Sequence, residues 1–190
     1  MNIVIFGPPG AGKGTQSKFI SSKYDLYQLS TGELLRKEIT DKTELGSQIS
    51  SIINVGELVS DHIVSNLIEK FISKEVYKNR LIFDGYPRNL NQPKNLDNLL
   101  NNYNQKIDVV LKLSVSLETI KKRISERQNQ ENRADDNEKI AVKRYKNYEM
   151  SISPVIKYYR QSNLLKVING EASITEINGE ISGLIETIKG

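Results

Sequence analysis

Residues 7–15 read GPPGAGKGT, directly after the apolar run IVIF at residues 3–6 and before a helical pattern at residues 16–23. Glycines at 7, 10, 12 and 14 allow positive φ angles, so several backbone N–H groups can point at one anion. The helix that follows adds the positive end of its dipole. A strand, a glycine-rich loop and a helix in this order therefore predict a site for the phosphates of a nucleotide.

Two side chains of this loop extend the prediction. Lys13 supplies a cation for the β and γ phosphates, and the hydroxyl of Thr15 can reach the shell of a Mg²⁺ ion. The strict pattern places Ser or Thr directly after the lysine, whereas Gly14 intervenes here. The loop is therefore a variant of the standard phosphate-binding sequence.

The composition excludes several classes of protein. Its 27 basic and 23 acidic residues give a net charge of +4 without a long basic tract, which favours a mixed surface over a nucleic-acid partner. The sequence has no cysteine, so it forms neither disulfides nor thiolate metal sites. No span has the apolar length of a membrane helix. A core strand begins within two residues of Met1 and leaves no room for a targeting peptide, so we expect a cytoplasmic protein.

Five short β-like runs alternate with longer helical patterns. Such alternation predicts an α/β fold of three layers, with a five-stranded parallel sheet and helices on both faces. We expect one domain over residues 1–190 and a ligand site beyond the carboxyl ends of the strands. The predicted strands span residues 2–6, 27–29, 80–83, 108–113 and 164–168.

Between the second and third strands, about fifty residues carry only helical patterns. Ser30 and Glu33 form the sequence of a capping box, and two more helices are predicted at 43–54 and 60–72. An insertion of this length exceeds an ordinary crossover, so we interpret it as a small subdomain that covers a site.

Further helices are predicted at 116–128, 136–159 and 173–188, with a polar break at 129–132. Pro154 lies inside the long helical pattern and should kink that helix or end it near Ser153. No apolar helix face is left without a partner element, so we expect a monomer.

Charged residues follow the predicted strands where a nucleotide enzyme needs them. Asp84 ends the third strand, where such an enzyme places the carboxylate that holds Mg²⁺ directly or through water. Arg88 follows it, and further arginines occur at 123, 127, 133 and 144. A guanidinium group binds two phosphate oxygens at once and stays charged at neutral pH. These arginines can therefore surround a phosphoryl group during its transfer.

The sequence offers no conventional acid–base machinery. Its one histidine, His62, lies on a predicted helix of the insertion, where we interpret it as a surface or packing residue, and no Ser/His/Asp or Cys/His group is available. A reaction in which a phosphate group is the acceptor needs no general base, because its attacking oxygen is already anionic. Such a reaction is compatible with these residues.

Together these motifs resemble the adenylate kinase family over essentially the whole chain. The matching segments are GPPGAGKGT at 7–15, STGELLR at 30–36, GELV at 56–59, FDGYPR at 83–88 with Gln92, and NRADDNEK at 132–139 followed by Arg144. The resemblance implies Mg²⁺-dependent transfer of a phosphoryl group from ATP to AMP, giving two ADP. It also implies an AMP-binding subdomain at 30–59 and a short, zinc-free lid at 127–133.

The resemblance also implies roles for individual residues. The ATP site would contain Gly10, Ala11, Gly12, Lys13, Gly14, Thr15, Arg123, Arg127 and Ala172. The AMP site would contain Thr31, Arg36, Glu57, Leu58, Val59, Gly85, Tyr86, Pro87, Arg88, Gln92, Arg133 and Arg144. The catalytic cations would be Lys13, Arg88, Arg127, Arg133 and Arg144. The metal would be held by Asp84, through water, and by Thr15.

Other functions remain alternatives at this point. Uridylate and cytidylate kinases share the loop and the short lid, but they resemble this pattern with Ala and Asn at the positions of Thr31 and Gln92. These two residues favour AMP as the acceptor. A non-catalytic nucleotide switch that reads guanine usually needs an Asn-Lys-x-Asp sequence, which this chain lacks.

Overall fold

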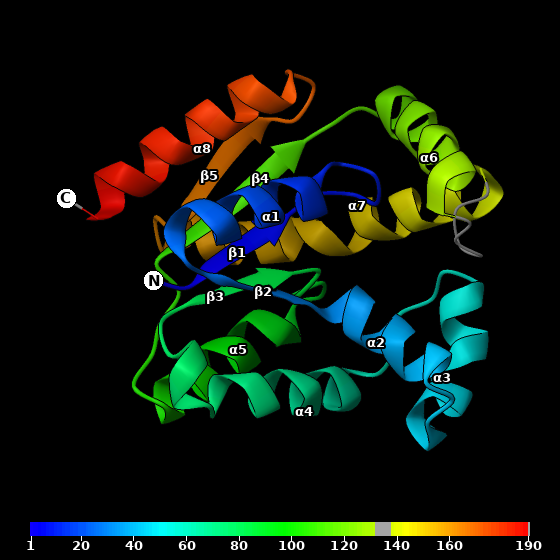
Figure 1. Cartoon of the computed structure of the whole chain (residues 1–190), viewed down its shortest axis with the longest axis horizontal. Helices are drawn as coiled ribbons and strands as arrows, with labels where there is room; N and C mark the ends of the chain where they lie inside the picture. Colours follow the sequence, from blue (N-terminus) through cyan, green and yellow to red (C-terminus); the bar gives the residue numbers. More distant parts are fainter. Residues whose placement is uncertain (132–137, 190) are drawn as a thin grey trace.

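The computed structural model describes residues 1–131 and 138–189. It confirms the predicted five-stranded parallel sheet, whose strand order is β2-β3-β1-β4-β5 (Figure 1). Each strand boundary lies within one residue of its predicted position. The strands are β1 (Ile3–Phe6), β2 (Tyr27–Ser30), β3 (Leu81–Asp84), β4 (Val109–Ser114) and β5 (Leu165–Asn169).

Helices cover both faces of the sheet, as the alternation of patterns predicted (Figure 1). One face packs against α1, α6 and α8, and the other packs against α4, α5 and α7. The helices in chain order are α1 (Lys13–Tyr24), α2 (Thr31–Thr40), α3 (Glu44–Asn54), α4 (Asp61–Ile72), α5 (Asn91–Asn102), α6 (Leu117–Glu131), α7 (Glu138–Gln161) and α8 (Ile174–Lys189), with a short 3₁₀ turn η1 (Glu75–Tyr77) before β3.

The central strand β1 shows how the core is divided. Val4 and Phe6 belong to the cluster under α4, α5 and α7, whereas Ile3 and Ile5 belong to the cluster under α1, α6 and α8. All four side chains are at most 3% exposed. Since successive side chains of a strand point to opposite faces, a strand buried on both faces must be apolar throughout.

The strand register brings three chain segments to one edge of the sheet. Ile5 pairs with Asp84, and Ser30 pairs with Asp84 from the other side. The residues that follow these positions therefore leave the sheet together. They are the start of the glycine-rich loop (residues 7–15), the start of α2 and the segment from Gly85 to Arg88.

The predicted helical insertion forms as α2, α3 and α4. Ser30 caps α2, since the backbone N–H of Glu33 donates to Ser30 Oγ (3.4 Å). Thr43 caps α3 in the same way, and the N–H of Gly46 donates to Thr43 Oγ1 (2.9 Å). In Figure 1, α2 and α3 project beyond the carboxyl ends of the strands on the same side of the molecule as α6. The insertion thus stands beside the edge where ligands are expected.

The structure bears on two expectations about helix ends. Helix α7 does not end near Ser153, which was one of the two outcomes expected at Pro154, but continues to Gln161. Ile152, Val155 and Tyr159 on this helix are at most 5% exposed, and their packing outweighs the hydrogen bond that Pro154 removes. Helix α6 continues through the expected break to Glu131, because Gln and Glu are good helix formers and polarity alone does not end a helix.

The lid prediction can be compared with the structure only in part. Residues 127–131 of the expected lid belong to α6, and residues 132 and 133 lie outside the described residues.

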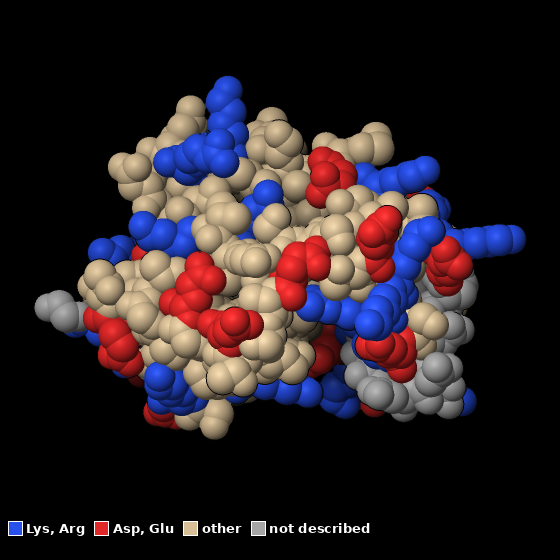
Figure 2. Space-filling view, turned by 90° about the horizontal axis from the view of Figure 1, so that it is seen from above, with Lys and Arg blue, Asp and Glu red and all other residues tan. Residues whose placement is uncertain are grey.

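The surface carries both signs of charge. On the face seen in Figure 2, Lys and Arg side chains are interspersed with Asp and Glu side chains. Among the helices in the described part of the chain, none combines the length and apolar character needed to cross a membrane.

Candidate active site

Two cavities open beside each other at the carboxyl edge of the sheet. We call them the donor cavity and the acceptor cavity. The donor cavity lies over the glycine-rich loop and reaches α6 and the start of α8. It is lined by all the residues expected at the ATP site: Gly10, Ala11, Gly12, Lys13, Gly14, Thr15, Arg123, Arg127 and Ala172.

The backbone conformation of the glycine-rich loop explains its composition. Gly12 has φ of 92°, a left-handed conformation that other residues rarely adopt, and it caps α1. The carbonyl of Gly12 accepts from Gln16 N (3.0 Å), which starts the helix directly after the loop. Helix α1 therefore directs its N-terminal N–H groups into the donor cavity, where they can bind an anion.

Lys13 is the first residue of α1, and its side chain folds back over the loop. The Nζ atom donates to the carbonyls of Gly7 (2.8 Å) and Pro8 (3.1 Å). Burial lowers the pKa of Lys13 to about 8, and the nearby Asp84 opposes this shift. The ammonium group is thus a partly desolvated cation, whose attraction for an anion is less screened by water.

Arg123 links the glycine-rich loop to the β5–α8 connection. Its guanidinium donates to the carbonyls of Ala11 (3.3 Å) and Gly170 (2.9 Å). The same connection is held by Glu171, which accepts from Ser116 N and from Thr119 Oγ1 (2.6 Å each). Sequence reasoning missed Glu171, because its partners precede it by about fifty residues and no local motif joins them.

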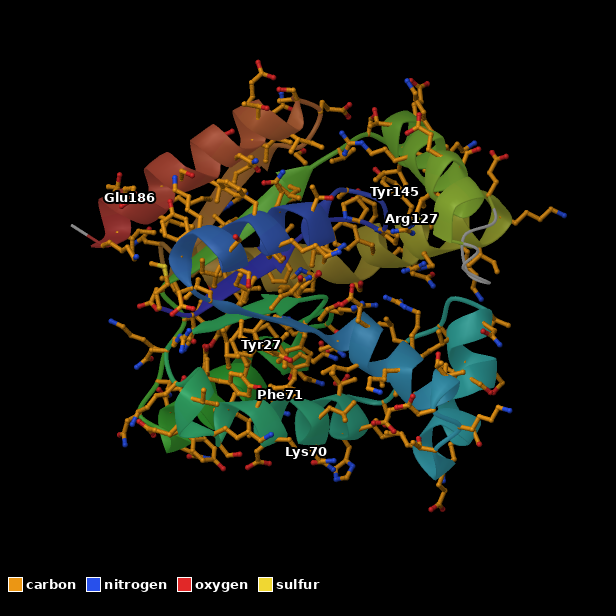
Figure 3. All side chains as sticks on the ribbon, in the orientation of Figure 1. Tyr27, Lys70, Phe71, Arg127, Tyr145 and Glu186 are labelled. Atoms are coloured by element: carbon orange, nitrogen blue, oxygen red, sulfur yellow. The ribbon has the colours of Figure 1, made fainter. Side chains whose placement is uncertain are left out.

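Arg127 is one helical turn beyond Arg123. It lies on the side of α6 that faces α7 (Figure 3) and lines the donor cavity. Its charge contributes to the lowered pKa of Lys13, so the two cations face the same region.

The acceptor cavity lies between the insertion, the β3–α5 loop and α7. It contains every described residue expected at the AMP site; Arg133 lies outside the described residues. The lining includes Thr31, Arg36, Glu57, Leu58, Val59, Gly85, Tyr86, Pro87, Arg88, Gln92 and Arg144.

Gly85 allows a close approach between the β3–α5 loop and its neighbours. A Cβ atom on Gly85 would lie 2.8 Å from Arg88 Nη2 and 3.1 Å from Thr31 Oγ1. The φ angle of Gly85 is 82°. Thr31 Oγ1 donates to the Gly85 carbonyl (3.1 Å), which also accepts from Arg88 Nε. Burial, and then the charge of Arg144, lower the pKa of Arg88 to about 10, so its guanidinium stays charged at neutral pH.

Gln92 is held from two sides. Its Nε2 donates to Asp61 Oδ1 (2.6 Å), and its Oε1 accepts from the N–H of Arg88 (2.6 Å). Asn89 Nδ2 also donates to Asp61, at 2.8 and 3.0 Å from the two carboxylate oxygens. Asp61 and Asn89 were not identified from the sequence, since they hydrogen-bond to Gln92 but belong to no phosphate-binding motif.

The loop at 56–59 contacts α7, which is distant in sequence. A Cβ atom on Gly56 would lie 3.0 Å from Cγ of Arg144. Beside it, Lys143 Nζ and Glu57 Oε1 form an ion pair at 2.8 Å. These contacts place Arg144 against the insertion, and its charge contributes to the lowered pKa of Lys13 in the glycine-rich loop.

The two cavities share part of their lining. Four of the shared residues are cations, and they come from three different helices and the β3–α5 loop: Lys13, Arg36, Arg88 and Arg144. A phosphate group in either cavity would therefore lie beside cations that also face the other cavity.

Comparison with known proteins identifies this arrangement. The family model described as adenylate kinase matches residues 5–164. The chain belongs to the adenylate kinase family. It is 39% identical to the adenylate kinase of Pelagibacter ubique over 98% of this chain and 100% of that protein. It is 43% identical to that of Prochlorococcus marinus strain MIT 9515, over 95% and 96% of the two chains.

Membership in the adenylate kinase family over nearly the full length confirms the predicted activity. This activity is the transfer of the terminal phosphoryl group of ATP to AMP, which gives two ADP. It accounts for two cavities that meet at a row of cations, because both substrates carry phosphates that repel each other.

Adenylate kinases generally use ATP with Mg²⁺, and the residues beside the cavities fit this ion. Asp84 is a buried carboxylate in the donor cavity, 7% exposed, and its Oδ2 accepts from Gln28 Nε2 (3.0 Å). Within the described residues, no three His, Asp or Glu side chains group as a metal site. One carboxylate suits Mg²⁺, which keeps several waters and takes its other ligands from substrate phosphates.

Proposed function

We propose that this adenylate kinase holds ATP in the donor cavity and AMP in the acceptor cavity. The observation that carries the proposal is the row of four cations that lines both cavities. A transferring phosphoryl group spreads its charge over three oxygens, and fixed cations at the junction would stabilise that charge without reorganisation.

In the donor cavity, the N–H groups of residues 10–15 and the ammonium of Lys13 hold the ATP phosphates. Arg127 adds charge from α6. Arg123 and the backbone near Ala172 flank the adenine. The hydroxyl of Thr15 and, through water, Asp84 would hold Mg²⁺, which would supply charge neutralisation to the phosphates when bound.

In the acceptor cavity, Arg36 and Arg88 hold the AMP phosphate. Thr31, the backbone of residues 57–59 and Gln92 contact the base, and residues 85–87 form the floor. Arg144, together with Arg133, closes on the phosphoryl group in transit. The subdomain at 30–59 and the lid at 127–133 would bring these groups together and exclude water, which competes as an acceptor.

The reaction needs no general base. An anionic oxygen of the AMP phosphate attacks the γ phosphorus of ATP in line, and the bond from that phosphorus to the β,γ-bridging oxygen breaks. ADP leaves without a proton transfer. His62 is exposed on α4 and interacts with Asn66 on the same helix, so its position agrees with this scheme.

A comparison of acceptors tests the base specificity of this proposal. ADP formation from ATP should be fastest with AMP and slower with UMP, CMP and GMP. Higher turnover with UMP or CMP would assign the chain to the pyrimidine nucleotide kinases of the same fold. A failure to form ADP with any monophosphate would favour a nucleotide-binding module.

The monomeric state and the cytoplasmic location expected from the sequence, and the absence of zinc, stay predictions. Sedimentation of the purified protein would measure its oligomeric state, and metal analysis would measure its zinc content.

A further inference from the structure

The amide of Gln92 has an orientation that its partners determine. Asp61 begins α4, Gln92 lies in the first turn of α5, and Arg88 precedes α5 in the loop. An ionised carboxylate only accepts hydrogen bonds, and a backbone N–H only donates. The atom facing Asp61 must therefore be nitrogen and the atom facing Arg88 N must be oxygen, both at 2.6 Å.

Turning this amide over would leave two mismatched pairs in a buried place. The side chain would then bring its oxygen to the Asp61 carboxylate and its NH₂ group to the N–H of Arg88. Gln92 is only 3% exposed, so water cannot replace the lost bonds at low cost.

Asn89 fixes Asp61 in turn. Its Nδ2 bonds both carboxylate oxygens, while its Oδ1 accepts from the N–H groups of Asn91 (3.0 Å) and Gln92 (3.2 Å) at the start of α5. The two ends of the Asn89 amide are thus also distinguished by their partners. The carboxylate is held by the loop that directly precedes Gln92 in the chain.

The bonded amide of Gln92 keeps one hydrogen on Nε2 and one lone pair on Oε1 for a base. Adenine presents a ring nitrogen that accepts and an amino group that donates, which matches this pair. Hypoxanthine and guanine present the reverse, a ring N–H and a 6-oxo group. Cytosine presents the same donor and acceptor pattern as adenine. The amide therefore distinguishes bases only by their hydrogen-bonding edge, and the size of the cavity must distinguish adenine from cytosine.

We propose that Asp61 is a positioning residue that fixes the orientation of the Gln92 amide and thereby selects adenine over 6-oxopurines at the acceptor site. The proposal rests on the proposed placement of AMP in the acceptor cavity. Asp61 acts through Gln92 and does not itself need to touch the nucleotide.

The test compares AMP with IMP, which has the same ribose and phosphate but the reversed base edge. In the Asp61→Asn variant the new side chain can present either an oxygen or a nitrogen, so only the N–H of Arg88 still sets the orientation of the Gln92 amide. Turning the amide over then leaves one mismatched pair in place of two, and the turned form becomes more populated. We expect the KM for AMP to rise about tenfold and the ratio of kcat/KM for IMP to that for AMP to rise about tenfold, with the KM for ATP unchanged. Glu69→Gln, two turns along α4, is the matched control and should change neither quantity.

Two further variants separate orientation from general damage. Asn89→Asp keeps the oxygen that caps α5 but sets a second carboxylate against Asp61, and it should raise the IMP to AMP ratio as well. The double variant Gln92→Leu/Asp61→Asn should have the same IMP to AMP ratio of kcat/KM as Gln92→Leu alone.

An unchanged IMP to AMP ratio in Asp61→Asn and Asn89→Asp overturns the proposal, even where turnover with AMP falls. A further change of the ratio in the Gln92→Leu background also overturns it. If the wild-type enzyme forms no ADP from ATP and AMP, the proposed function fails instead, and this result is distinct from both.

Discussion

The donor and acceptor cavities lie side by side, yet they are built in different ways. The donor cavity is formed around one contiguous loop, whose residues at the start of α1 line the cavity with their backbone. The acceptor cavity takes side chains from α2, the 56–59 loop, the β3–α5 loop, α5 and α7, and hydrogen bonds between these segments set their orientation. In the proposed function, binding of the ATP phosphates thus depends on local backbone conformation, and recognition of the AMP base depends on tertiary contacts.

The largest effect is expected at Lys13, which belongs to both cavities. Lys13→Met should lower kcat/KM by about 10³-fold, since it removes the ammonium that stabilises charge at the junction. Steady-state ADP formation measures it. Lys23→Met, on the same helix but exposed and outside both cavities, is the control and should retain activity. Similar losses in the two variants would contradict a specific role for Lys13.

Arg88→Ala should lower kcat/KM by about 10²-fold, or about 3 kcal/mol, through loss of the acceptor phosphate clamp. Arg80→Ala is a matched control, because Arg80 pairs with Asp25 at 2.6 Å and lines neither cavity. Near-normal kcat/KM for Arg88→Ala would show that the clamp lies elsewhere.

The titration of Lys13 should appear in ATP binding. Because burial lowers its pKa to about 8, the free enzyme loses this charge as the pH rises from 7 to 9. ATP affinity should then fall by up to about tenfold over this interval, and binding should take up a proton near pH 8. Calorimetric titration in buffers of different ionisation enthalpy measures both quantities. A fall that persists in Lys13→Met would assign the effect to another group.

The same pKa shift has an opposite consequence for stability. The unfolded chain keeps the Lys13 proton up to its ordinary pKa of 10.5, whereas the folded chain releases it near 8. Between these values the unfolded state binds more protons, so the contribution of Lys13 to the free energy of unfolding rises with pH. Denaturant titrations of wild type and Lys13→Met at pH 8 and 10 measure the difference.

The smallest effect is expected at Glu171, the side chain that orders the β5–α8 connection beside the donor cavity. Glu171→Ala should raise the KM for ATP about threefold and leave the KM for AMP unchanged, because two hydrogen bonds to the start of α6 are lost. Glu180→Ala, exposed on α8, serves as the control. A rise in the KM for AMP instead would show that the two cavities are less independent than their construction indicates.

Most of the fold could be predicted because its signals are local. Apolar runs placed the five strands within one residue, and Ser30 and Thr43 marked the starts of α2 and α3. One expected helix end did not occur because packing overrides local preference. Pro154 did not end α7, because the helix is buried on both sides of that residue.

The candidate site divides in the same way. The residues taken from motifs line the two cavities, apart from Arg133, which lies outside the described residues. The residues that hold them in place were missed: Gln28 against Asp84, Asp61 against Gln92, and Glu171 against the start of α6. Each pair is separated by tens of residues and has no common motif.

The sequence by itself determined the α/β alternation, the phosphate-binding loop and the membership in the adenylate kinase family, because helix starts, strand patterns and backbone turns depend on neighbouring residues. Only the tertiary structure decided which cations meet at the junction of the cavities and which way the Gln92 amide faces. Charge proximity and hydrogen-bond direction depend on distances between segments, and these distances are set when the sheet register and the helix packing bring the segments together.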